Sequence, residues 1–210
     1  DRRRDGRGVM DDRISRQLRF VAEVDQLKTI LRQTRLIDGS RPENTAEHSW
    51  HLALAGSILA EHAPPGTDAA RSIRMMLIHD VVEIDAGDTF AFDTAGYLDK
   101  PEREALAAAR IFGLLPPDQG AELRALWEEF EAGTSPDARF AVAMDRIQPL
   151  LQNFHGGGGS WRAHGITRAQ VLRRMDPIRE GAPTLWPTVV AMIDEARTLG
   201  HIAPDPPAVP

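Results

Sequence analysis

The segment Met75–Thr89, MMLIHDVVEIDAGDT, carries ionisable side chains inside an apolar run. His79 and Asp80 are flanked on both sides by Leu, Ile and Val. A helix that is apolar almost all round belongs at the centre of a bundle. Because a buried ionisable group without a partner is strongly destabilising, the chain must fold so that other polar groups reach this pair.

Helical periodicity dominates the rest of the chain. Apolar residues from Ile14 recur at three- and four-residue steps, which predicts a first helix of about 20 residues. Asn44 with Glu47 forms a capping pattern, Asp68 can cap the helix that carries the His-Asp pair, and Gly87 can end that helix. Strand alternation is absent throughout. The predicted fold is all-α, a single-domain bundle of about 7 to 9 helices. The helices are expected at 14–33, 45–63, 69–86, 101–113, 116–133, 135–154, 167–179 and 183–199.

The domain limits follow from where this periodicity starts and stops. We expect a flexible N-terminal tail at 1–12, the helical domain at 13–200 and a proline-rich tail at 201–210. The glycine run at 156–160 indicates a flexible loop between two helices.

Composition excludes several classes of function. The net charge of -6 and pI near 5.6 lack the basic excess needed to bind a nucleic-acid polymer. No apolar run approaches the ~20 residues that span a bilayer. The chain has no cysteine, so a metal could be held only by His, Asp or Glu. We expect a cytoplasmic protein that binds neither nucleic acid nor membrane.

Two further residues supply metal-competent side chains on predicted inward faces. His48 shares a helix face with Leu52, and Asp145 lies among Val, Met, Ile and Leu. Taken singly, a buried His is often only hydrogen-bonded, and a buried Asp often pairs with an arginine such as Arg146. Together with His79 and Asp80 they form a mixed nitrogen and oxygen set that suits divalent metals such as Zn, Mn or Fe.

The order of these residues resembles a known family. His48, the pair His79-Asp80 and Asp145 match the H…HD…D pattern of the HD-domain metal-dependent phosphohydrolases, an all-α superfamily. The blocks RPENTAEHSWHLAL, LIHDVVEIDAGD and AMDRIQPLL are similar to those of its 5'-deoxynucleotidase branch. The resemblance implies that these four residues bind one divalent ion (Mn, Co, Zn, Fe, Ni or Mg), that the substrate is a small nucleotide and that the protein is a homodimer.

The same resemblance gives roles to the residues after the His-Asp pair. Glu83, four residues after His79, would orient or deprotonate the attacking water; the alternative is a carboxylate that holds a ligand histidine. Asp88 would contact substrate and assist proton transfer, whereas its alternative is to cap the loop. The residues expected to line the nucleotide pocket are Thr89, Phe90 and Ala91.

Substrate contacts are also expected on either side of the first histidine. Arg35 is the better match to the family's phosphate-binding arginine, with Arg41 as a second candidate. Deoxyribose-selective members carry Trp directly after that arginine, whereas this chain has Leu36, so the sequence assigns no sugar. Glu129 loosely matches a substrate-contacting glutamate of the family.

The leading hypothesis is therefore a metal-dependent phosphohydrolase that acts on nucleoside 5'-monophosphates. One rival reaction is hydrolysis of another phosphoester such as guanosine tetraphosphate. Members with that activity carry Glu-Asp where this chain has Glu83-Ile84. The other alternative is a non-catalytic helical module that keeps a metal for stability and binds a nucleotide or a protein.

Overall fold

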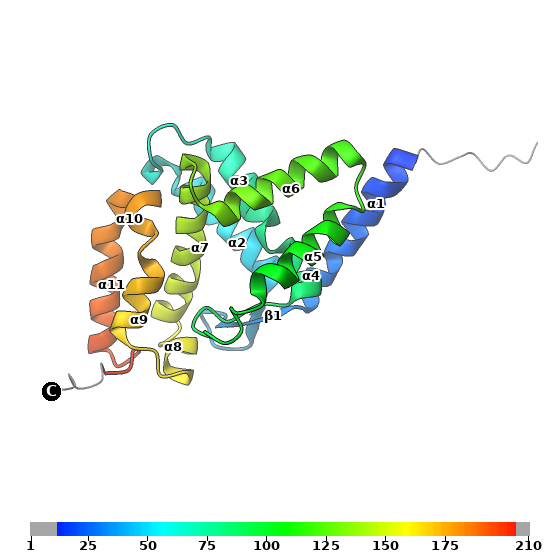
Figure 1. Ribbon diagram of the computed structural model, residues 1–210. Helices are drawn as coiled ribbons and strands as arrows, with labels where there is room; N and C mark the ends of the chain where they lie inside the picture. The colour runs from blue at the N-terminus through cyan, green and yellow to red at the C-terminus, as the bar shows by residue number, and fades with distance from the viewer. Residues whose placement is uncertain (1–11, 205–210) are drawn as a thin grey trace, which may run out of the picture.

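The structure is a computed structural model that describes residues 12–204 and is mainly helical (Figure 1), which confirms the all-α prediction. Residues 1–11 and 205–210, and with them most of both expected tails, lie outside the described residues. No helix of the described part is long and apolar enough to cross a membrane. The α-helices are α1 Asp12–Val24, α2 Thr45–Ile58, α3 Ala69–Ile78, α4 Glu83–Ala86, α5 Lys100–Phe112, α6 Pro117–Ala132, α7 Pro136–His155, α8 Gly159–Ala163, α9 Arg168–Met175, α10 Ile178–Gly181 and α11 Trp186–Thr198. Short 3-10 helices are η1 Asp25–Thr29, η2 Ala60–His62, η3 His79–Val82 and η4 Pro183–Leu185.

Helix α7 is the central element. In Figure 1 it stands between the C-terminal helices α9, α10 and α11 on one side and α2 and α3 on the other. It packs against α2, α3 and α10, and Phe140, Met144 and Leu150 on it are fully buried in the main core. Residues on α7 are therefore held rigidly against α2 and α3.

The start of the chain differs from the predicted helix of about 20 residues. Helix α1 ends at Val24, and η1 leads into a two-stranded antiparallel sheet of β1 Leu31–Arg35 and β2 Pro42–Asn44. The expectation of no strand was wrong here. Side chains alternate along β1, with Thr34 buried and Arg35 exposed, but five residues are too few for that alternation to stand out in the sequence.

The segment with the His-Asp pair is also not one continuous α-helix. Helix α3 starts at Ala69 after the cap Asp68, as expected, but it ends at Ile78. His79 and Asp80 lie in the 3-10 turn η3, and Gly87 follows α4 with a φ of 74°, a conformation that favours glycine. Residues three apart lie in line in a 3-10 helix, so the turn aligns Glu83 with Asp80.

The glycine run and the end of the domain are both packed. Gly156, Gly157 and Gly158 form the turn between α7 and α8, and Asn153 Oδ1 accepts a hydrogen bond of 3.0 Å from Ser160 Oγ. In the expected C-terminal tail, residues 201–204 are described: Ile202 is buried in the core, and Ala203 N donates to Ile166 O at 2.9 Å.

Candidate metal centre

Two histidines turn the same ring nitrogen toward one point. His48 on α2 is fully buried, and its Nδ1 lies 2.9 Å from Gln148 Oε1. Gln148 Nε2 in turn donates to Glu43 Oε1 at 2.9 Å, which fixes the orientation of the amide. His79 Nδ1 lies 2.9 Å from the Met76 carbonyl oxygen. Both partners can only accept, so each Nδ1 carries the hydrogen and each Nε2 presents a lone pair.

Two aspartates close the space in front of these nitrogens. His48 Nε2 is 3.0 Å from Asp145 Oδ1 and 3.6 Å from Asp80 Oδ2. His79 Nε2 is 3.1 Å from Asp80 Oδ1 and 3.7 Å from Asp145 Oδ1. Ligand atoms of His48, His79 and Asp145 all lie within 4.8 Å of one another, and Asp80 borders this group.

This arrangement needs a cation at its centre. Imidazole lone pairs and carboxylate oxygens repel one another at such distances, and burial strengthens the repulsion. Burial would lower the pKa of His79, but the charge of Asp80, whose Oδ1 lies 3.1 Å from His79 Nε2, raises that pKa well above its ordinary value. Neutral imidazoles held at Nδ1, together with carboxylates, are a donor set that fits a divalent metal ion.

Glu83 lies beside this group without belonging to it. Its side chain is buried, and Thr45 Oγ1 donates to its Oε2 at 2.8 Å. Burial, followed by the charge of Asp80, raises the pKa of Glu83 well above its ordinary value. A carboxylate whose pKa is raised in this way is a stronger base than an ordinary glutamate.

Arg32 is a central residue of the site that sequence reasoning missed. Its Nη1 lies 3.0 Å from Asp80 Oδ2, 3.3 Å from Asp88 Oδ1 and 3.9 Å from Glu83 Oε1. Burial alone would lower its pKa, but the charges of Asp80 and Asp88 raise it above the ordinary value. The period-two alternation of β1, with residues 32 and 34 inward and residue 35 outward, is the signal that could have found it.

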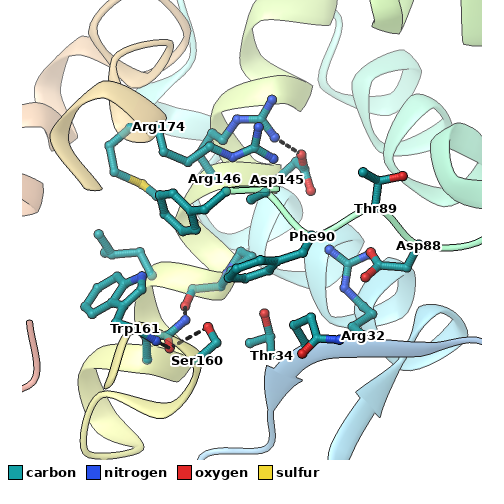
Figure 2. Close-up of a pocket in the computed structure, with 17 residues that line it drawn as sticks. Arg32, Thr34, Asp88, Thr89, Phe90, Asp145, Arg146, Ser160, Trp161 and Arg174 are labelled. Carbon is teal, nitrogen blue, oxygen red and sulfur yellow. Dashed lines mark hydrogen bonds and ion pairs between the residues drawn. The ribbon is translucent and has the colours of Figure 1, made fainter. Parts of the chain in front are cut away.

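A pocket opens beside these groups (Figure 2). Asp88, Thr89, Phe90 and Ala91 all line it, as the sequence analysis expected of a substrate pocket. Arg103 clamps the loop that carries them, because its guanidinium donates to the carbonyl oxygens of Ala86 and Gly96 and to Thr89 Oγ1. The remaining lining residues come from β1, α7, α8 and α9 and the loop at 87–92: Arg32, Gln33, Thr34, Phe92, Asp145, Arg146, Pro149, Leu150, Asn153, Ser160, Trp161, Arg174 and Met175.

Four expected substrate contacts lie elsewhere. The exposed Arg35 donates through Nε and Nη2 to Gly39 O in the turn after β1. Arg41 pairs with Glu47, and Leu36 lies in the same separate depression as Arg41. Glu129 on α6 accepts hydrogen bonds from Arg71 and Ser135. Their substrate roles stay predictions, and none of the four lines the pocket beside the histidines.

The sequence profile of a family described as HD domain matches residues 24–186. The chain belongs to the HD domain family. A solved structure described as a predicted metal-dependent phosphohydrolase from Magnetospirillum magnetotacticum MS-1 is 55% identical, has a TM-score of 0.89, and covers 92% of this chain and 97% of its own.

Other relatives of this HD domain protein are more distant. Human 5'-deoxynucleotidase HDDC2 is 32% identical over 136 residues, and the match spans 64% of this chain and 65% of the human protein's length. The mouse protein of that name gives 32% identity over 67% of its length. PH0347 from Pyrococcus horikoshii OT3, at 22% identity with a TM-score of 0.63 over 83% of this chain and 99% of its own, shares the fold.

We predict that replacing His48 abolishes metal binding, because a buried ligand atom is lost and no neighbouring side chain can replace it. The loss of a supporting partner alone weakens metal affinity by about 10- to 100-fold, so the loss of a ligand should cost more. Elemental analysis of dialysed His48→Ala should find no bound ion. His62→Ala is the matched control, because His62 bonds Thr184 outside the cluster and this variant should keep its ion. Equal occupancy in both variants would contradict the assignment.

Proposed function

We propose that the protein is a metal-dependent phosphohydrolase that releases phosphate from nucleoside 5'-monophosphates. The observation that carries this proposal is the buried Glu83 carboxylate, whose Oε1 lies 3.9 Å from Nη1 of Arg32, a residue that lines the pocket and also contacts Asp80. A metal kept only for stability has no use for a second, unligated carboxylate next to it. The names of the human and mouse relatives support the choice of nucleotide.

In this proposal His48, His79, Asp80 and Asp145 hold one divalent ion. When bound, such an ion supplies Lewis-acid stabilisation and lowers the pKa of water. The Nδ1 hydrogen bonds to Gln148 and Met76 orient the two imidazoles for this task. The homodimer and the identity of the metal stay predictions.

Glu83 positions and deprotonates the attacking water. Its raised pKa follows from burial, and Thr45 fixes one of its oxygens, so the other is available to accept a proton. Arg32 places positive charge at the pocket wall, where it can bind the scissile phosphate. Asp88, held 3.3 Å from Arg32 and with a pKa raised by burial, is the group placed to protonate the leaving sugar oxygen.

A phosphate-release assay tests the proposal directly. The metal-loaded protein should hydrolyse ribo- or deoxyribonucleoside 5'-monophosphates, lose that activity with a chelator and regain it with added Mn or Co. Guanosine tetraphosphate serves as the rival substrate in the same panel, with released pyrophosphate measured as well as phosphate. Hydrolysis of that compound alone, or no turnover of any phosphoester at full metal occupancy, would refute the proposed function.

Glu83→Gln should lower the rate by roughly 10² to 10⁴, because the amide keeps the shape but loses the basicity. Metal content and melting temperature should stay close to those of the wild type. Asp85→Asn on the same helix is the control, because Asp85 pairs with Arg110. If Glu83 instead only supports a ligand histidine, excess Mn should restore most of the rate, and that rescue would sink its catalytic role.

Arg32→Lys and Arg35→Lys form a matched pair that separates the structural from the sequence assignment. Lysine keeps the charge but loses the two-pronged contact to phosphate, so Arg32→Lys should raise KM about tenfold, which is the loss of about one net charged hydrogen bond. Arg35→Lys should leave KM within about twofold of the wild type, since Arg35 contacts only the Gly39 turn. Steady-state kinetics with one nucleotide gives the KM of both variants. A larger increase in KM for Arg35→Lys than for Arg32→Lys would assign phosphate binding to Arg35 instead.

A further inference from the structure

Two arginines of the pocket take no part in the proposed hydrolysis. Arg146 follows Asp145 on α7, and Arg174 lies near the end of α9. Both line the pocket, and Figure 2 shows their guanidinium groups together on the Asp145 side of Phe90, opposite Arg32 and Asp88.

The charges of this pair are poorly balanced. The guanidinium of Arg146 contacts Asp145 through Nη1, while its buried Nε has no hydrogen-bond partner. Within residues 12–204, Arg174 has no carboxylate at ion-pair distance, and its polar contact is the Tyr97 hydroxyl at 3.4 Å. The two positive charges thus have one carboxylate at ion-pair distance, and that carboxylate contacts Arg146.

The carboxylate of Asp145 also faces the proposed metal site. Asp145 Oδ1 faces the ring nitrogens of His48 and His79, so a metal ion in that group would draw on the same negative charge. Arg32 differs, because it faces the carboxylates of Asp80 and Asp88 within 3.3 Å. Partly buried cations without a counter-charge are unfavourable, and a bound anion relieves that cost.

We propose that Arg146 and Arg174 bind a second phosphoryl group of the substrate, the one that is not hydrolysed. This inference rests on the proposed function. The nucleobase of the substrate offers only partial charges to the two guanidinium groups. A phosphoryl group offers formal negative charge and matches their paired hydrogen-bond donors. The apolar faces of Phe90 and Trp161 line the same pocket and suit the nucleoside between the two phosphoryl groups.

The reaction itself stays the same. The water oxygen forms a bond to the scissile phosphorus, the bond from phosphorus to its leaving oxygen breaks, and that oxygen takes up a proton. The second phosphoryl group remains on the product. It is attached at the sugar 3' position, because the nucleoside then lies between it and the scissile group.

The test compares kcat/KM of metal-loaded wild type and Arg174→Gln for 2'-deoxyadenosine 5'-monophosphate, its 3',5'-bisphosphate and its 5'-diphosphate. Wild type should prefer the 3',5'-bisphosphate, because only this compound has its nucleoside between two phosphoryl groups. In Arg174→Gln the preference should fall about tenfold, the loss of about one charged hydrogen bond. Arg173→Gln is the charge-matched control, because Arg173 is exposed on the same helix and outside the pocket.

Two outcomes would overturn the inference: no preference of wild type for the 3',5'-bisphosphate over both other compounds, or equal losses for all three substrates, which would assign the pair to the scissile phosphate. If Arg174→Gln does not fold, Arg174→Lys takes its place. If wild type hydrolyses none of the compounds, the proposed function fails. The second phosphoryl site is then tested by calorimetry, which compares the affinity of wild type and of Arg174→Gln for the bisphosphate. About tenfold weaker binding to Arg174→Gln supports a second phosphoryl site, and equal affinities refute it.

Discussion

Two imidazole lone pairs and two carboxylates face one another at the centre of the bundle, and such a group is stable only with positive charge between its members. The surrounding structure serves this constraint. Helices α2 and α7 and the 3-10 turn η3 each supply one side of it, and their packing around α7 keeps the four groups within contact distance. Gln148 and the Met76 carbonyl then fix which nitrogen of each ring faces inward.

The polar neighbours of this group are organised by the same charge. Arg32 offsets the carboxylates of Asp80 and Asp88, while Glu83 is left buried with its pKa raised. The two sides of the pocket differ in charge. Arg32 lies on the side that carries the carboxylate of Asp88, whereas Arg146 and Arg174 lie together on the other side. The proposed chemistry uses the first side and the proposed second phosphoryl site uses the other.

The sequence predicted the parts of the site that lie on regular helices. His48 and Asp145 are inward at steps that helical periodicity reveals, and the capping pair Asn44 and Glu47 is confirmed. Arg32 escaped because the short strand β1 was assigned to a helix, which hid that residues 32 and 35 point to opposite sides.

Contacts between residues far apart in the sequence could not be predicted from local sequence patterns. Arg174 lines the same pocket as Arg146 only because α9 packs against α7. No spacing in the sequence predicts that packing. Similarly, the change from α-helix to a 3-10 turn at His79 depends on tertiary packing, since a run of apolar residues is compatible with either form.

We expect one divalent cation to bind between His48, His79 and Asp145. A crystal structure of the Mn-loaded protein, with data collected for the anomalous signal of Mn, is the sharpest test of this site. It should show one anomalous peak per chain within bonding distance of both Nε2 atoms and of Asp145, with Asp80 completing the protein ligands. No peak at this position, or a single peak at another site of the chain, would contradict it.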